Sequence, residues 1–133
     1  MSRGAVSRGV GDTSLFIARE SGRALDTESL PDELAVSVIT IGELRAGVLA
    51  AATIEMRDRR LATLTEALAL GPLPVDDGVA QAWARLRVEL RDRGLRMPVN
   101  DSWIAATALS LGIPVVTQDD DYVDLPALAV VRV

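Results

Sequence analysis

The sequence predicts a single α/β domain in which helices pack against a parallel β-sheet. Two nearly continuous apolar segments rich in β-branched residues, "ELAVSVIT" and "IPVVT", are typical of strands buried in a parallel sheet. Segments with apolar residues at helical spacing alternate with them, as in strand–helix–strand units. The length of 133 residues suits one domain with a sizeable core, and we expect residues 1–133 to form it.

The first strand is the weakest element of this pattern. Residues 5–10 predict it, but Arg8 and two nearby glycines interrupt its apolar character. Either the strand is short and Arg8 reaches solvent, or the segment is frayed. The rest of the first half is clearer, and it predicts a helix over 15–22, a strand over 33–40 and a helix over 40–51.

The second half alternates in the same way. Apolar stripes at helical spacing predict three helices, and Gly71 and Gly94 are placed to end two of them. Pro98 breaks the chain before the third helix. The helices are expected over 54–71, 79–94 and 100–112, and the strands over 73–75, 113–117 and 127–133.

Few kinds of side chain are available for chemistry. The chain has no cysteine, which excludes disulfides and thiolate nucleophiles, and no histidine, the usual general base. It has no lysine either, so Schiff-base chemistry and a Walker-type phosphate loop are excluded. The 19 Asp and Glu residues remain. If the protein is an enzyme, the leading hypothesis for its catalysis is a hard cation held by carboxylates.

The charge and hydropathy of the chain limit its partners and its location. A formal net charge of −5 argues against a generic nucleic-acid coat, which would be basic, and suits a basic protein partner. It does not exclude a nuclease, because a bound divalent cation restores positive charge locally. No segment approaches the ~20 apolar residues of a membrane span, and the N-terminus lacks a signal-peptide core. We therefore expect a cytoplasmic protein with no membrane association.

Acids from distant parts of the chain fall at one predicted edge of the sheet. In parallel α/β sheets the ligand site lies outside the carboxyl ends of the strands. The predicted elements place four acids where strands end and helices begin, so that they can converge: Asp12, Glu43, Asp101 and Asp119.

The first two acids also have ordinary structural explanations. Asp12 can cap the helix that follows it, with Thr13 and Ser14 as competing caps. The segment from Thr40 to Glu43 matches a capping box, in which the acid bonds back to the backbone of the cap residue.

The later acids have such explanations too. Asn100, Asp101 or Ser102 can cap the next helix, and the helix dipole favours an acid in a first turn. The three acids at 119–121 can form a solvated turn. They repel one another, however, so a fixed loop there would benefit from a bound cation.

Other polar and aromatic residues favour structural roles. Asp76 and Asp77 are predicted helix caps. Trp83 and Trp103 lie among aliphatic residues and are predicted to belong to the core rather than to a base-stacking platform. A group of arginines predicts a solvated helix face, with phosphate contact as the alternative, at positions 85, 87, 91, 93 and 96.

Four short motifs, in order along nearly the whole chain, resemble the PIN-domain family, specifically the ribonuclease toxins of bacterial VapBC toxin–antitoxin pairs. The motifs are "DTSLFIA", "ITIGELRAGV", "NDSWIAATALSLG" and "PVVTQDDDY". The resemblance implies a parallel sheet flanked by helices on both faces. The first strand departs from the family pattern, which is a clean apolar run up to the first acid.

The resemblance also implies the site residues. Asp12, Glu43 and Asp101 match the three principal acids of the family, and Asp119 matches the fourth. Asp121, which precedes an aromatic residue, is the second candidate for the fourth position. Small hydroxyl residues that hydrogen-bond around the acids are matched by Thr13 and Thr117.

The implied activity is metal-dependent hydrolysis of RNA. The five acids are expected to hold one or two Mg²⁺ or Mn²⁺ ions, with Asp12 and Asp101 as central ligands. The implied partners are a VapB-type antitoxin, a second copy in a homodimer, and an RNA that the sequence does not identify. Two helix faces are candidates for the antitoxin groove, or simply core: Ile41–Val48 and Ile54–Leu68.

Functions of other classes fit the sequence less well. A receiver-type phospho-acceptor domain requires a lysine, which the chain lacks. A haloacid-dehalogenase-like phosphatase requires an acid two residues after the first one, where this chain has Ser14. The remaining alternative is a PIN-like protein that keeps the acids but only binds partners, and metal-dependent cleavage distinguishes the two.

Overall fold

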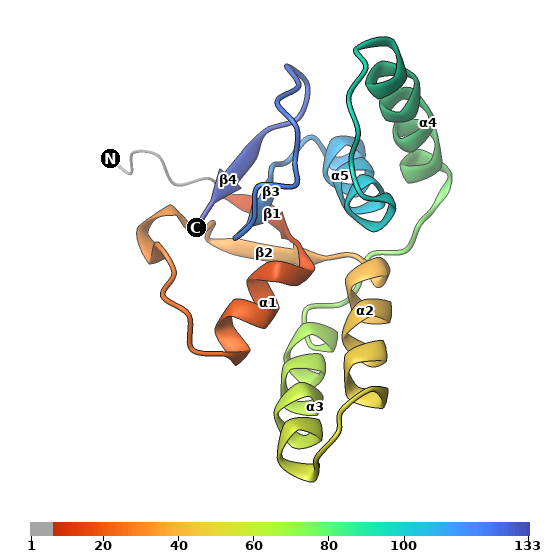
Figure 1. Ribbon diagram of the computed structural model, residues 1–133. Helices are drawn as coiled ribbons and strands as arrows, with labels where there is room; N and C mark the ends of the chain where they lie inside the picture. The colour runs from red at the N-terminus through yellow and green to blue at the C-terminus, as the bar shows by residue number, and fades with distance from the viewer. Residues whose placement is uncertain (1–6) are drawn as a thin grey trace.

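A four-stranded parallel sheet forms the centre of the computed structural model, which describes residues 7–133 (Figure 1). Its order is β2-β1-β3-β4, with every neighbouring pair parallel. The strands are β1 (Arg8–Gly11), β2 (Glu33–Val36), β3 (Val115–Thr117) and β4 (Val130–Arg132).

Helices cover both faces of the sheet. Alternate residues of a strand point to opposite faces, and neighbouring Ala35 and Val36 belong to different core clusters. Ala35 packs with α4 and α5, whereas Val36 packs with α1, α2 and α3 (Figure 1). The predicted class, a parallel sheet flanked by helices on both faces, is confirmed. The helices are α1 (Thr13–Glu20), α2 (Val38–Leu49), α3 (Ile54–Leu68), α4 (Asp77–Asp92) and α5 (Val99–Leu111).

The direction of the strand order changes between β1 and β3. From β1 the chain goes to β2 on one side, and the later strands β3 and β4 lie on the other side. The carboxyl ends of β1 and β3 therefore flank a topological switch point, where α/β proteins bind ligands. Directly after β1, the Asp12 N–H donates to the Val116 carbonyl at 3.0 Å, which fixes the two strand ends together.

The first strand is displaced from its predicted position. It spans Arg8–Gly11, and the predicted positions 5 and 6 lie outside the described residues. Arg8 pairs with Glu33 on the neighbouring strand at 3.3 Å. A Cβ on Gly9 would lie 2.6 Å from a methyl of Val116, so this glycine allows β3 to pack against β1. The residues that weaken the local pattern thus serve the pairing.

The second strand is shorter than predicted, and the helix after it starts earlier. The strand ends at Val36, and Ser37 caps α2 by accepting the Ile39 N–H at 3.0 Å. The β-branched residues 38–41 therefore lie in a helix, because the cap and tertiary packing override their strand propensity. The predicted capping box from Thr40 to Glu43 is wrong, since both residues lie inside α2.

The remaining differences concern element ends. Helix α5 begins at Val99, so Asp101 is its third residue, and no side chain caps it. The predicted strand over 73–75 is reduced to one bridge between Ser37 and Leu73, and the last strand spans three residues. Within residues 7–133, every helix is too short or too polar to cross a lipid bilayer.

Candidate metal centre

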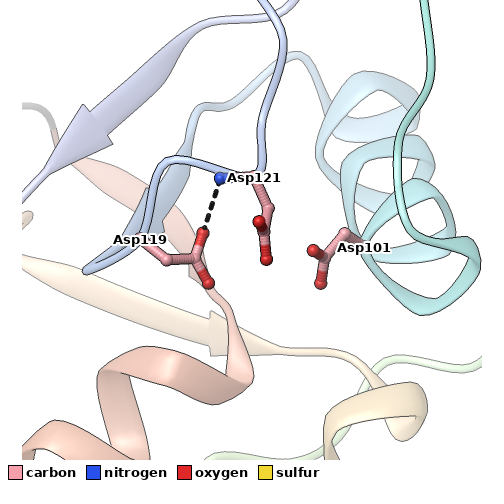
Figure 2. Close-up of side chains that lie close together, drawn as sticks. All are labelled: Asp101, Asp119 and Asp121. Atoms are coloured by element: carbon pink, nitrogen blue, oxygen red, sulfur yellow. Dashed lines mark hydrogen bonds between the residues drawn. The ribbon is translucent and has the colours of Figure 1, made fainter.

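Three carboxylates meet at the switch point (Figure 2). Asp101 comes from the first turn of α5, and Asp119 and Asp121 come from the loop after β3. One oxygen of each lies within 4.8 Å of the others. The Asp121 N–H donates to Asp119 Oδ1 at 3.1 Å, and the Asp121 side chain points toward Asp101 (Figure 2). We call Asp101, Asp119 and Asp121 the acid cluster.

Asp12 lies deeper and is held by hydroxyl groups. Its side chain is 1% exposed, and its Oδ1 caps α1 by accepting the Leu15 N–H at 3.2 Å. Oδ1 also accepts the Ser14 hydroxyl at 2.7 Å, and Oδ2 accepts the Thr117 hydroxyl at 2.6 Å. The Thr117 oxygen in turn accepts the Asp119 N–H at 3.1 Å. Asp12 is therefore both a helix cap and a neighbour of the acid cluster.

Glu43 lies at the rim of the site. It is half-buried in α2, and its Oε1 accepts the Thr13 hydroxyl at 2.5 Å. Glu43 lies outside the group of oxygens within 4.8 Å of one another, but its charge reaches Asp101. The hydrogen bonds that the sequence predicts for Thr13 and Thr117 are present.

Burial and like charges disfavour ionisation at this edge. Burial, and then the charges of the surrounding acids, raises the pKa of Asp101 to about 7. The pKa of Asp12 is raised as well, chiefly by burial, although the hydroxyls of Thr117 and Ser14 oppose the shift. Among the described residues, no arginine lies within ion-pair distance of the acid cluster. The repulsion thus lacks a protein counter-charge there.

The C-terminal strand holds the loop that carries two of these acids. Arg132 of β4 donates to the carbonyls of Asp119 and Tyr122, each at 3.3 Å, and pairs with Asp120 at 3.2 Å. The Val133 N–H donates to the Thr117 carbonyl at 2.9 Å. The position of Asp119 and Asp121 therefore depends on contacts with Arg132 and Val133.

The structure adds residues whose roles the sequence pattern does not predict. Ser14 binds Asp12 and accepts the Gln118 N–H at 3.0 Å, which ties α1 to the acidic loop. Tyr122 is 3% exposed, and its hydroxyl lies near the acids with no hydrogen-bond partner of good geometry among the described residues. Burial and the charge of Asp12 raise the pKa of Tyr122. Spacing alone carries no signal for these contacts, because they join separate segments.

The two tryptophans are half-buried rather than fully in the core. Their rings stack at 4.3 Å between centroids, and they pack against a cluster between α4 and α5. Trp83 donates its indole N–H to the Ser102 hydroxyl at 3.0 Å. This bond links α4 to the first turn of α5, next to Asp101.

Known proteins match this chain in sequence and in fold over nearly its whole length. The profile of the PIN domain matches residues 10–128. Ribonuclease VapC5 of Mycobacterium tuberculosis is 54% identical over 125 residues, which cover 94% of this chain and 93% of the relative. Ribonuclease VapC4 of the same organism is 46% identical over 128 residues, which cover 96% of this chain and 98% of the relative. The solved structure of VapBC-5 from M. tuberculosis, a toxin–antitoxin system, matches with a TM-score of 0.87 and 48% identity, over 96% of this chain and 99% of that one.

Proposed function

The chain belongs to the PIN-domain family, and from this premise we propose that it is a metal-dependent endoribonuclease and the toxin of a type II toxin–antitoxin pair. Its curated relatives are named ribonucleases, and the match extends over nearly the whole chain. We also propose that residues 1–133 form one domain. Hydrolysis would add water across a phosphodiester P–O bond, leaving a phosphate on one fragment and a hydroxyl on the other.

The observation that carries this proposal is the meeting of three carboxylate oxygens within 4.8 Å, with no ion pair from any of the three to an arginine of residues 7–133. Oxygen ligands of this kind suit Mg²⁺ or Mn²⁺, and a bound divalent cation would offset the burial and the repulsion that together raise the pKa of Asp101. When bound, such a cation lowers the pKa of a coordinated water and stabilises charge on the phosphate.

The residues divide into those that would bind directly and those that would support them. Asp101, Asp119 and Asp121 present the clustered oxygens and are the proposed direct ligands. Asp12 keeps its predicted role as a central ligand, and Glu43 keeps its predicted role as a ligand that binds directly or through water. The hydroxyls of Thr117 and Ser14 orient the Asp12 carboxylate from below the site.

An antitoxin is the proposed protein partner. A cavity of about 210 Å³ beside the acidic edge is lined by Ile17 of α1, Glu43 and Leu44 of α2 and Arg60 of α3, among others. Exposed apolar side chains continue this surface onto the α2–α3 pair, notably Leu49, 80% exposed, and Ile54, 74% exposed. Because Glu43 belongs to both the cavity and the acidic edge, a basic segment docked here would reach the acids.

Only part of the two predicted apolar helix faces is available for this docking. Ile41, Leu44 and Leu64 are buried in the core, as the alternative interpretation expected.

We expect Ile54→Arg to weaken binding of the cognate antitoxin in size-exclusion chromatography, and Val88→Arg, on α4, to leave it unchanged. The homodimer and the cytoplasmic location stay predictions.

Cleavage of a mixed total-RNA pool by the purified protein tests the proposed function. Discrete cuts in Mg²⁺ or Mn²⁺ that vanish in EDTA and in Asp101→Asn would support it. Asp124→Asn is the matched control, since it removes the same charge from an exposed residue outside the acid cluster. A folded, antitoxin-free protein that makes no cuts with either ion would favour the binding-only alternative instead.

A further inference from the structure

A second charged site lies on the α4 side of the molecule. A cavity of about 360 Å³ separates the C-terminal half of α4 from the segment that leads into α5. Three arginines line it in a protein whose formal net charge is −5. The lining residues are Arg87, Arg91 and Arg96 with Leu90, Leu95 and Met97. We call this the arginine cavity.

The charges of these arginines are largely uncommitted. Among residues 7–133, Arg91 pairs with its exposed neighbour Asp92 alone, at 3.3 Å, and surface pairs of this kind contribute little to stability. Within residues 7–133, neither Arg87 nor Arg96 has a carboxylate within ion-pair distance. The Arg87 guanidinium lies over the Trp83 ring, 5.3 Å from its centroid, which orients it without neutralising it.

The arginine cavity is connected to the acidic edge through packed residues. Trp83, whose ring lies under the Arg87 guanidinium, donates its indole N–H to the hydroxyl of Ser102, the residue after Asp101. Arg87 lies four residues beyond Trp83, about 6 Å farther along α4. Arg96 belongs to the segment that runs down beside α4 to the start of α5 (Figure 1). The helix that carries most of the arginine cavity is thus tied to the first turn of α5, which carries Asp101.

The chemistry of the cavity matches a phosphodiester chain. The planar guanidinium group binds phosphate oxygens in a fork, and Leu90 and Met97 give the cavity a buried apolar floor for a ribose or a base. The acidic edge repels phosphates, so an RNA needs a cationic anchor elsewhere on this acidic protein. We propose, resting on the proposed function, that the arginine cavity binds the backbone of the RNA substrate on one side of the cleavage site.

RNA binding by paired variants tests this inference. We would place Arg91→Gln with Arg96→Gln in the Asp101→Asn protein and measure fluorescence anisotropy with a labelled random-sequence RNA pool over a salt series. The matched control is Arg85→Gln with Arg93→Gln, which removes the same charge from α4 and from a different cavity. Thermal melting checks that both variants fold.

The cavity variant should bind about tenfold more weakly at low salt, and its salt slope should fall by about 1.4, since each phosphate contact to a single strand contributes about 0.7. The control should change little. Equal losses in both variants would show a general charge effect and overturn the inference. Unchanged RNA binding by the cavity variant would also overturn the inference, provided that the unsubstituted protein cleaves RNA. A protein that neither cleaves nor binds RNA would overturn the proposed function and this inference with it.

Discussion

The starts of α1 and α5 lie at the same edge of the sheet, and each presents an acid, yet the two acids are held differently. Asp12 caps α1 and accepts hydrogen bonds from a backbone N–H and two hydroxyls. Asp101 is the third residue of α5, and no hydrogen bond to its carboxylate is found among residues 7–133. The difference separates an acid built into the scaffold from one whose repulsion only a bound ligand would offset.

The largest expected effect is on catalysis at α5. Asp101→Asn should lower the RNA cleavage rate roughly a thousandfold, because a metal site contributes several kcal/mol and each 1.36 kcal/mol is about tenfold in rate. The melting temperature in EDTA should not fall, since the substitution removes a repelled charge. A variant that keeps more than about a tenth of the rate, measured beside Asp124→Asn, would contradict this role.

A comparison of Asn and Ala at both positions sharpens the contrast. Asp12→Asn keeps the cap of α1 and should be more stable than Asp12→Ala by about 1–2 kcal/mol. At position 101 the two substitutions should differ by less than about 0.5 kcal/mol, because no hydrogen bond is lost there. Urea unfolding in EDTA measures both differences. Equal differences at the two positions would mean that the helix starts are alike after all.

Removal of one donor should expose how Asp12 is supported. Thr117→Val keeps the shape of the side chain but deletes the hydroxyl that donates to Asp12, so we expect a loss of about 1 kcal/mol in the free energy of unfolding. Thr27→Val, at an exposed site, is the control and should change stability little. Chemical denaturation of both proteins checks the prediction, and a similar loss in both would refute it.

The last prediction concerns the dependence of stability on pH without metal. The pKa of Asp101 is raised from its ordinary 3.8 to about 7, so the folded protein binds more protons than the unfolded chain between these values. Stability in EDTA should therefore fall as pH rises from about 4 to about 7. Melting curves should show a shallower fall for Asp101→Asn. A stability that rises with pH in this window would contradict the interpretation that Asp101 lacks a compensating charge in the absence of metal.

Much of the fold was predictable because it depends on patterns that lie within single segments. The strand "IPVVT" and the stripes of α3 and α4 appear close to where the sequence places them. The sequence pattern assigns residues 38–40 to a strand because β-branched residues favour strands, whereas the Ser37 cap and the packing of Ile41 select a helix. Gly9 was read as a weakness, since its close neighbour Val116 lies far along the chain.

The site was predictable at the level of residue identity but not of contact. The five acids come from the family motifs together with the rule that ligands bind at strand ends, and their roles stay predictions. The sequence could not show that Asp121 joins Asp101 while Glu43 stays at the rim, because side-chain reach depends on where α2 begins. The hydroxyl contacts of Ser14 and the hydrogen bond between Trp83 and Ser102 also join separate segments.

The contacts of Arg132 and Val133 with the acidic loop and the end of β3 predict which mutations would inactivate the protein. If expression of the active protein is harmful, surviving clones need not carry changes in any acid. Arg132 holds two carbonyls of the loop, and Val133 holds the end of β3, so a nonsense codon at position 130 would remove both residues and still leave all five acids encoded. We expect escape alleles to include such truncations and substitutions at Arg132, which lies outside the four motifs that resemble the family.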